Sequence, residues 1–275
     1  MNYFVYRFVC DPVKPTTEIL ISKLAELDFE SFMDNETGTD AYVPADVESE
    51  EKVKSLLVDL EGTISYQREE IPEQNWNARW EADYEPVCVD TTFRVRAPFH
   101  ESDPAYTHEI IIQPQMSFGT GHHETTWLML NEMDGLKLKG KSVLDAGSGT
   151  GVLAIAAQKL GAGPTLAYDI EEWAYQNTLE NVALNHADME VRKGDASVIG
   201  DTTFDIIFAN INKNVLLSDL PRFAKALNRG GALLLSGFFQ TDVDDLVVAA
   251  EAQGLTKESV KTRNDWAVVV LVASR

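Results

Sequence analysis

Apolar and polar positions follow a regular pattern in the second part of the chain. From about residue 89 onward, short apolar runs typical of buried strands alternate with stretches that have helical spacing. The predicted strands cover residues 142–147, 164–170, 189–195, 204–211 and 231–238. The predicted helices cover residues 152–160, 171–186, 214–228 and 242–254. This βα repetition predicts a doubly wound α/β domain with a mostly parallel sheet.

Two further strands are predicted at the C-terminal end, at 256–264 and 266–274. The turn between them is too short for a parallel crossover, so they form a hairpin. One C-terminal strand must therefore run antiparallel to the rest of the sheet.

The first 71 residues follow a different pattern. Strands are predicted at 2–9, 40–45 and 63–71, and helices at 16–29 and 48–60. This succession favours a small α+β domain of the ferredoxin-like kind.

A short predicted helix links the two parts. Residues 72–87, "PEQNWNARWEADYEPV", place Trp76 and Trp80 four positions apart on one helical face. The pair is interpreted as an anchor between domains or as a lip over an active site. The predicted organisation is a small domain at 1–71, a linker helix at 72–88 and a second domain at 89–275.

The composition limits the partners and the compartment. A net charge of −21 disfavours avid binding to nucleic acid and favours a basic protein partner or simple solubility. Residues 1–71 hold 16 acidic and 6 basic residues, so the acidic excess is concentrated there. No apolar run is long enough for a membrane helix, and no CxxC spacing involves Cys10 or Cys88. We expect a cytoplasmic, monomeric protein that does not bind membranes.

The glycine-rich stretch "VLDAGSGTGVLAIA", residues 143–156, carries the clearest chemical signal. A phosphate-binding P-loop requires a lysine after the last glycine, and a dinucleotide fingerprint requires a glycine at position 152, which is Val152. The pattern here is Asp145-x-Gly147-x-Gly149-x-Gly151. Asp145 would repel a pyrophosphate but could hold an ammonium group, directly or through water. S-adenosylmethionine has an ammonium, a sulfonium and no phosphate, and we predict it as the cofactor.

Polar residues at three other strand ends extend this site. Asp169 could accept both ribose hydroxyls, and Asp195 could lie beside the adenine. Asn210, in "FANIN" (208–212), could offer its amide carbonyl to an amine substrate at the point where ligands bind in open α/β sheets. The alternatives are solvated turn aspartates and a turn-forming asparagine.

Four stretches, in this order and spacing, resemble the bacterial PrmA family, the methyltransferases of large-subunit ribosomal protein eleven. They are "SFGTGHHETT" (117–126), "VLDAGSGTGVLAIAA" (143–157), "AYDIEEWA" (167–174) and "IIFANI" (206–211). The resemblance covers nearly the whole chain. It implies a small N-terminal recognition domain, a short linker and a class I methyltransferase domain.

The resemblance also implies roles for individual residues. Those implied to contact S-adenosylmethionine are Thr126, Gly147, Asp169 and Asn210, and those implied to form a loop over it are Phe118, Gly119, Thr120 and Gly121. Where the family usually has Thr-His-Pro after this loop, the chain has His122-His123-Glu124. Only His122 and Glu124 could share a face, and no third ligand is nearby, so we predict no metal site.

The implied function is methyl transfer from S-adenosylmethionine to lysine side-chain and N-terminal α-amines of ribosomal protein eleven. Alternatives are a methyltransferase that acts on another protein amine, a glutamine amide or a small molecule, and a catalytically silent scaffold that binds S-adenosylmethionine. The absence of prolines after Asn210 speaks against an amide substrate, and the intact glycines and strand-end acids speak against a silent scaffold.

Overall fold

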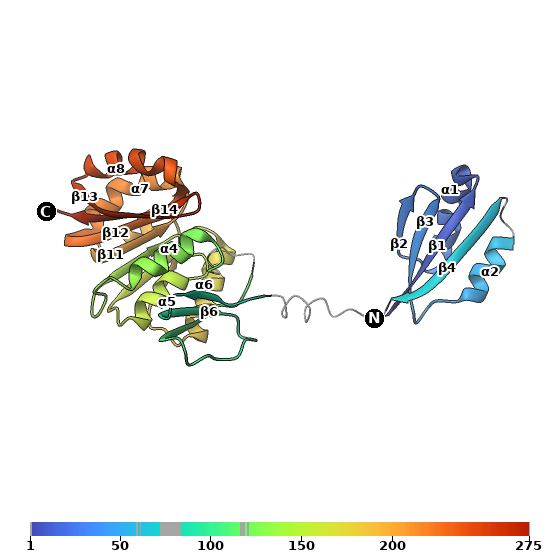
Figure 1. Cartoon of the computed structure of the whole chain (residues 1–275), viewed down its shortest axis with the longest axis horizontal. Helices are drawn as coiled ribbons and strands as arrows, with labels where there is room; N and C mark the ends of the chain where they lie inside the picture. The colour runs from blue at the N-terminus through green and yellow to red at the C-terminus, as the bar shows by residue number, and fades with distance from the viewer. Residues whose placement is uncertain are drawn as a thin grey trace. The chain divides into compact units, whose positions relative to one another are not determined.

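The structure is a computed structural model that describes residues 2–58, 60, 62–71, 84–115, 119 and 121–274. The chain divides into two compact units, Met1–Asp83 and Tyr84–Arg275 (Figure 1). Most of the predicted linker helix, including Trp76 and Trp80, lies outside the described residues. No helix in the described part of the chain has the length and apolar character needed to cross a membrane.

The first unit is a four-stranded antiparallel sheet with two helices. Its elements are β1 (Tyr3–Asp11), α1 (Val13–Leu24), η1 (Ala25–Leu27), β2 (Ser31–Asn35), β3 (Gly38–Pro44), α2 (Glu50–Val58) and β4 (Thr63–Ile71). The strand order is β2-β3-β1-β4. Alternate β1 residues, Tyr6 and Phe8 among them, join Leu20 and Leu24 of α1 in the core. This β-α-β-β-α-β order is that of a ferredoxin-like fold. Strand β2 was not predicted from the sequence.

The second unit contains the predicted doubly wound sheet. Its seven strands have the order β10-β9-β8-β11-β12-β14-β13. The strand bounds are β8 (Val143–Ala146), β9 (Thr165–Asp169), β10 (Glu190–Lys193), β11 (Phe204–Asn210), β12 (Leu227–Phe239), β13 (Leu255–Arg263) and β14 (Trp266–Ala273). Pairs among β8 to β12 are parallel, whereas β14 runs antiparallel to both β12 and β13. The predicted antiparallel hairpin is therefore present.

Helices cover both faces of this sheet (Figure 1). Their bounds are α4 (Glu124–Met133), α5 (Val152–Lys159), α6 (Glu172–Leu184), α7 (Lys213–Ala226) and α8 (Val243–Glu251), with short 3₁₀ turns η2 (Ala196–Ile199) and η3 (Gln240–Asp242). In β11, Phe208 packs with residues of α4 and α5, while Ile207 packs with residues of α7 and α8. Consecutive strand residues thus face opposite layers, as a sheet buried on both sides requires.

A small three-stranded sheet precedes α4 and was not predicted. It consists of β5 (Val87–Val89), β6 (Phe93–Arg96) and β7 (His108–Ile111). Strand β5 pairs with β6, so this unit includes residues that the sequence analysis placed in the linker. The backbone carbonyls of Tyr84 and Glu85 also bond to the rings of His100 and His122.

Candidate functional site

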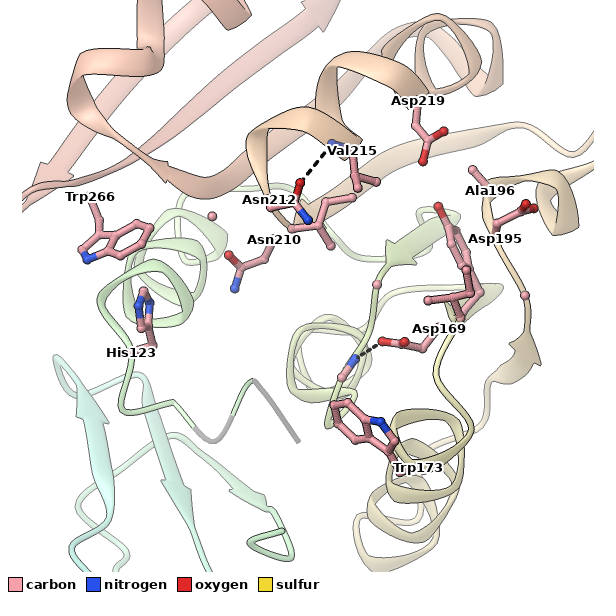
Figure 2. A pocket seen from close by; sticks show the side chains of 17 residues that line it. His123, Asp169, Trp173, Asp195, Ala196, Asn210, Asn212, Val215, Asp219 and Trp266 are labelled. Carbon is pink, nitrogen blue, oxygen red and sulfur yellow. Dashed lines mark hydrogen bonds between the residues drawn. The ribbon is translucent and has the colours of Figure 1, made fainter. Parts of the chain in front are cut away.

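A cavity of about 480 Å³ opens at the carboxyl ends of β8, β9 and β11. The strand order reverses between β8 and β11, which is where ligands bind in open α/β sheets. Figure 2 shows two ends of this cavity. Asp169, Trp173, Asp195 and Asp219 lie at one end, called here the acidic end. Asn210, His123 and Trp266 lie at the other, called the amide end.

The glycine loop between β8 and α5 forms part of the cavity wall. Gly147, Gly149 and Gly151 have φ values of 70°, 55° and 78°, in the left-handed region that favours glycine. A Cβ atom on Gly147 would lie 2.3 Å from Cγ2 of Ile211, so a side chain there would displace a neighbour. Gly147 and Gly149 both line the cavity, and because neither has a side chain a ligand can approach the backbone closely there.

Asp145 does not line the cavity. Its side chain is buried, and Oδ2 accepts a hydrogen bond from the backbone N–H of Ala154 at 3.1 Å. Burial, with a smaller contribution from the nearby charge of Asp169, raises the pKa of Asp145 to about 7. The carboxylate therefore ties the end of β8 to helix α5, and its contact with an ammonium group stays a prediction.

Asp169 and Asp195 lie at adjacent strand ends and both line the cavity. Asp169 accepts hydrogen bonds from the backbone N–H groups of Gly149 and Glu171, at 2.9 and 3.0 Å. Asp195 caps η2 through a bond from the backbone N–H of Ser197 at 2.8 Å. Hydrogen bonds from Ser197 lower the pKa of Asp195, which keeps it ionised.

Asn210 ends β11 at the amide end and is 9% exposed. Its Nδ2 donates to Oγ1 of Thr126 at 3.3 Å. Its Oδ1 is buried and has no hydrogen-bond partner among the described residues. An unpaired buried carbonyl costs free energy, so this oxygen is suited to accept a bond from a ligand. Thr126 is itself fully buried, and its hydrogen bond to Nδ2 orients the amide group of Asn210.

The predicted loop of residues 118–121 is only partly described. Phe118 and Thr120 lie outside the described residues. The carbonyl of Gly119 accepts a hydrogen bond from Oγ1 of Thr150 at 2.6 Å, which ties it to the glycine loop. A Cβ atom on Gly121 would lie 3.3 Å from Val87, so Gly121 packs against β5.

Helix α6 holds the glycine loop and the segment that leads to residue 119. Oγ1 of Thr178 donates to the carbonyl of Gly149 at 3.0 Å. Asn181 donates to the carbonyl of Thr150 at 2.9 Å and accepts from the backbone N–H of Gln113 at 2.8 Å. Sequence reasoning missed Asn181, although a fully buried asparagine on a helix needs partners of this kind.

Several other cavity residues were also missed. At the acidic end they include Tyr168, whose hydroxyl is buried without a hydrogen-bond partner in the described part of the chain. Burial and the charge of Asp219 raise the pKa of Tyr168, and burial raises that of Asp219. At the amide end, the rings of His123 and Trp266 lie 4.5 Å apart in an edge-on arrangement.

The absence of a metal site at His122 and Glu124 stays a prediction. In the ranges that the structure describes, no three His, Cys, Asp or Glu side chains gather in a way that could hold a metal ion.

Asn212, which also lines the cavity, caps α7 by accepting a hydrogen bond from the backbone N–H of Val215 (Figure 2).

The charges around the cavity limit its ligand. Three aspartates line it, Asp169, Asp195 and Asp219, and none of the described lining residues is lysine or arginine. A phosphate-bearing nucleotide would meet repulsion here, whereas a cationic ligand would be attracted. Glycines without side chains in the cavity wall, strand-end carboxylates and an unpaired amide carbonyl together fit S-adenosylmethionine beside an amine.

Known proteins with similar sequences and structures agree with this description. Residues 15–274 match the family described as ribosomal protein L11 methyltransferase (PrmA). The ribosomal protein L11 methyltransferase of Porphyromonas gingivalis is 45% identical over 281 residues, which cover 98% of this chain and 97% of that protein. The protein of the same name from Bacteroides thetaiotaomicron is 40% identical over 98% of this chain and 99% of its own length.

A solved structure also resembles this chain. The ribosomal protein L11 methylase of Lactobacillus delbrueckii subsp. bulgaricus superposes with a TM-score of 0.65 at 27% identity. The match covers 70% of this chain and 100% of the other.

Proposed function

The chain belongs to the PrmA family of ribosomal protein L11 methyltransferases, and from this premise we propose that it methylates amines of ribosomal protein L11 with S-adenosylmethionine. The single observation on which the assignment of the site rests concerns the side-chain carbonyl oxygen of Asn210. It is buried and unpaired among the described residues, and it belongs to a cavity that holds three aspartates.

The acidic end and the glycine loop would hold the cofactor, which supplies an electrophilic methyl group on a sulfonium. Gly147 and Gly149 let the cofactor approach the backbone closely, Asp169 would accept the ribose hydroxyls, and Asp195 would lie beside the adenine. Asp145 would act on the ammonium through water, because its carboxylate does not reach the cavity. The loop of residues 118–121 would close over the bound cofactor.

The amide end would hold the substrate amine. Deprotonation of the amine is the main difficulty. At about pH 7.4, deprotonating a lysine of pKa ~10.4 costs about 4 kcal/mol, and deprotonating an α-amine of pKa ~8 costs under about 1 kcal/mol. A desolvated amine near a sulfonium has a lowered pKa, which reduces both costs. Asn210 would then orient the amine lone pair through Oδ1 without adding a charge that favours the ammonium form.

His123 is poorly placed to be a dedicated base. Its Nδ1 already accepts a hydrogen bond from the backbone N–H of Thr125 and contacts the hydroxyl of the same residue at 2.8 Å. Burial lowers the pKa of His123, which keeps the ring neutral. Positioning and electrostatics therefore carry most of the rate in this proposal.

The acidic first unit would recognise the substrate. It would present both lysine side chains and the N-terminal α-amine of ribosomal protein L11, a basic partner in this proposal, to a site in the second unit. The protein would act in the cytoplasm, where that substrate is made.

The test has two stages. Isothermal calorimetry should show binding of S-adenosylmethionine, and incubation with purified ribosomal protein L11 should add whole methyl groups, seen as intact mass. An unrelated basic protein serves as the control substrate. Cofactor binding without any mass increase on ribosomal protein L11 would contradict the proposed substrate, and absence of cofactor binding would contradict the proposed site.

A further inference from the structure

Two segments that are far apart in sequence meet at the amide end of the cavity. Helix α4 begins at Glu124, directly after His123, which is its N-cap. Strand β14 begins at Trp266, directly after the two-residue turn Asn264–Asp265 of the C-terminal hairpin. Figure 2 shows His123 and Trp266 close together beside Asn210. Trp266 also packs on Phe239 of β12, with ring centroids 4.3 Å apart.

Glu124 connects these two segments through both of its carboxylate oxygens. Oε2 lies 2.6 Å from Nε of Arg263, and Oε1 accepts a hydrogen bond from Nδ2 of Asn264 at 2.7 Å. Arg263 and Asn264 are the last residue of β13 and the first of the turn, and Arg263 pairs with Trp266 across the hairpin. We call this set of contacts the Glu124–hairpin contact.

Two features make this contact specific in its geometry. Asn264 has a φ of 51°, in the left-handed region, which fixes the direction in which the hairpin turns. The guanidinium of Arg263 also lies over the ring of Trp127, 4.1 Å from its centroid and one turn further along α4. Arg263 is therefore held by two residues of α4, three positions apart, on the same side of the helix.

A glutamate in the first turn of a helix interacts favourably with the helix dipole without any partner. Here both oxygens are instead directed to the hairpin. Glu124 does not line the cavity, so it has no place in the proposed contacts to cofactor or amine. Its neighbours in sequence and across the contact, His123 and Trp266, do line it.

We propose that Glu124 is a positioning residue that holds Trp266 against His123 and thereby fixes the wall of the amide end. This inference rests on the proposed function, because it assumes that the amide end receives the substrate amine. The contact sets the width of the space beside Asn210. Loss of Glu124 lets the hairpin turn move away from α4, and the amine then has more than one position.

The effect of losing Glu124 on turnover can be separated from its effect on folding. The side chains of Glu124 and Arg263 are 27% and 41% exposed, and ion pairs this exposed contribute little to stability. Misplacement of a reacting group by about 1 Å, in contrast, can lower a rate by about 100-fold. The variant Glu124→Ala should therefore fold normally, bind cofactor normally and turn over slowly.

The same two elements provide a matched control. Nζ of Lys261 in β13 lies 2.5 Å from Oε1 of Glu132 in α4, two residues before Arg263 and away from the cavity. The variant Lys261→Met removes an ion pair between α4 and β13 without touching the turn. The variant Glu124→Gln keeps the acceptor for Asn264 but loses the charge that faces Arg263, and gives an intermediate case.

The experiment measures steady-state methylation of ribosomal protein L11, cofactor affinity by calorimetry and the thermal midpoint for all four proteins. We expect kcat of Glu124→Ala to fall roughly 10- to 100-fold. Glu124→Gln should fall less, Lys261→Met should match the parent in kcat, and cofactor Kd should stay near the parent value throughout. The thermal midpoint should stay near the parent value in both Glu124 variants and fall in Lys261→Met, because the side chain of Glu132 is only 10% exposed and loses its partner. A parent-like kcat in Glu124→Ala overturns the proposal, and so does an equal loss of kcat in Lys261→Met.

A readout without substrate separates this inference from the proposed function. If the parent adds no methyl group to ribosomal protein L11, the proposed function fails. Amide hydrogen exchange of the peptide that spans residues 262–267 then decides the Glu124–hairpin contact. Faster exchange in Glu124→Ala but not in Lys261→Met supports it, and unchanged exchange in Glu124→Ala overturns it.

Discussion

The carboxylate of Asp169 accepts a hydrogen bond from the backbone N–H of Gly149, with Oδ2 and N 2.9 Å apart. Its other oxygen accepts from the backbone N–H of Glu171 at 3.0 Å. The acid at the end of β9 thus fixes both its own turn and the middle of the glycine loop. Loop and carboxylate are held in one arrangement by the protein itself, which reduces the ordering cost of binding a cofactor.

The first prediction concerns the proposed bond from Asp169 to the ribose. The change Asp169→Ala should weaken binding of S-adenosylmethionine by roughly 1.5–3 kcal/mol, the range for hydrogen bonds to a charged group. Calorimetry measures this, with Asp201→Ala, at an exposed position away from the cavity, as the control. Unchanged affinity would show that Asp169 does not hold the ribose.

Because Asp169 also holds Gly149, a second ligand is needed to separate the two roles. An S-adenosylhomocysteine analogue that lacks the 2′-hydroxyl should bind the parent less tightly than S-adenosylhomocysteine does. That difference should shrink in Asp169→Ala if the ribose bond is real. An equal difference in both proteins would assign the whole effect to the glycine loop.

The second prediction concerns pH and Asp145. Burial raises the folded-state pKa of this carboxyl to about 7, above the usual 3.8. Between these values the folded protein binds more protons than the unfolded chain, so the stability contributed by this site declines as pH rises from about 4 to 7. The change Asp145→Asn removes this decline and keeps an acceptor for the N–H of Ala154.

Denaturant unfolding at pH 5 and pH 8 measures the effect. The stability of Asp145→Asn relative to the parent should increase by roughly 2–3 kcal/mol between these pH values. The comparison between variant and parent cancels the pH dependence of the other groups. A difference that stays constant with pH would show that Asp145 titrates like an exposed aspartate.

Those predicted site residues that belong to local patterns in the chain lie together in the structure. A glycine loop after an apolar strand, and polar residues at the next strand ends, come with fixed spacing, and Gly147, Asp169 and Asn210 line one cavity. Their contacts with a ligand stay predictions. The direction of the Asp145 side chain was not predictable in this way. The carboxylate could point either toward the first turn of α5 or into the cavity. In the structure it points toward α5, where it accepts a hydrogen bond from the backbone N–H of Ala154.

The remainder of the site depends on contacts between distant segments. His123 and Trp266 are adjacent only because the C-terminal hairpin packs against α4, and no periodic pattern encodes that pairing. Strands β5 to β7 are short and consist of three or four residues each, so they leave no clear alternation. Strand β2 is mostly exposed, which removes the apolar signal by which strands are recognised.

The third prediction concerns the first unit. A fragment that begins at residue 84 keeps strand β5 and the hydrogen bonds that the carbonyls of Tyr84 and Glu85 accept, which a fragment beginning at residue 89 would lose. It should bind S-adenosylmethionine within about twofold of the parent, because the described cavity residues all lie in the second unit. It should methylate ribosomal protein L11 poorly.

Circular dichroism and a cooperative thermal transition establish first that the fragment is folded. Methylation by the folded fragment at the rate of the full chain would refute a recognition role for the first unit. Addition of residues 1–71 as a separate polypeptide should not restore the rate, because the effective concentration supplied by the covalent connection is lost.

The last prediction concerns Asn210. Its Nδ2 donates to Thr126, which directs Oδ1 to the amine in the proposed site. The change Asn210→Ala removes the orienting oxygen. The change Asn210→Asp keeps the shape but adds a charge, which favours the protonated, unreactive ammonium and raises the pKa of the amine. Both variants should lose turnover far more than cofactor affinity, and Asn210→Asp should partly recover as pH rises, since the amine is then deprotonated more often. Single-turnover assays across pH measure this, and a rate for Asn210→Asp equal to that of the parent at neutral pH would show that Asn210 does not position the amine.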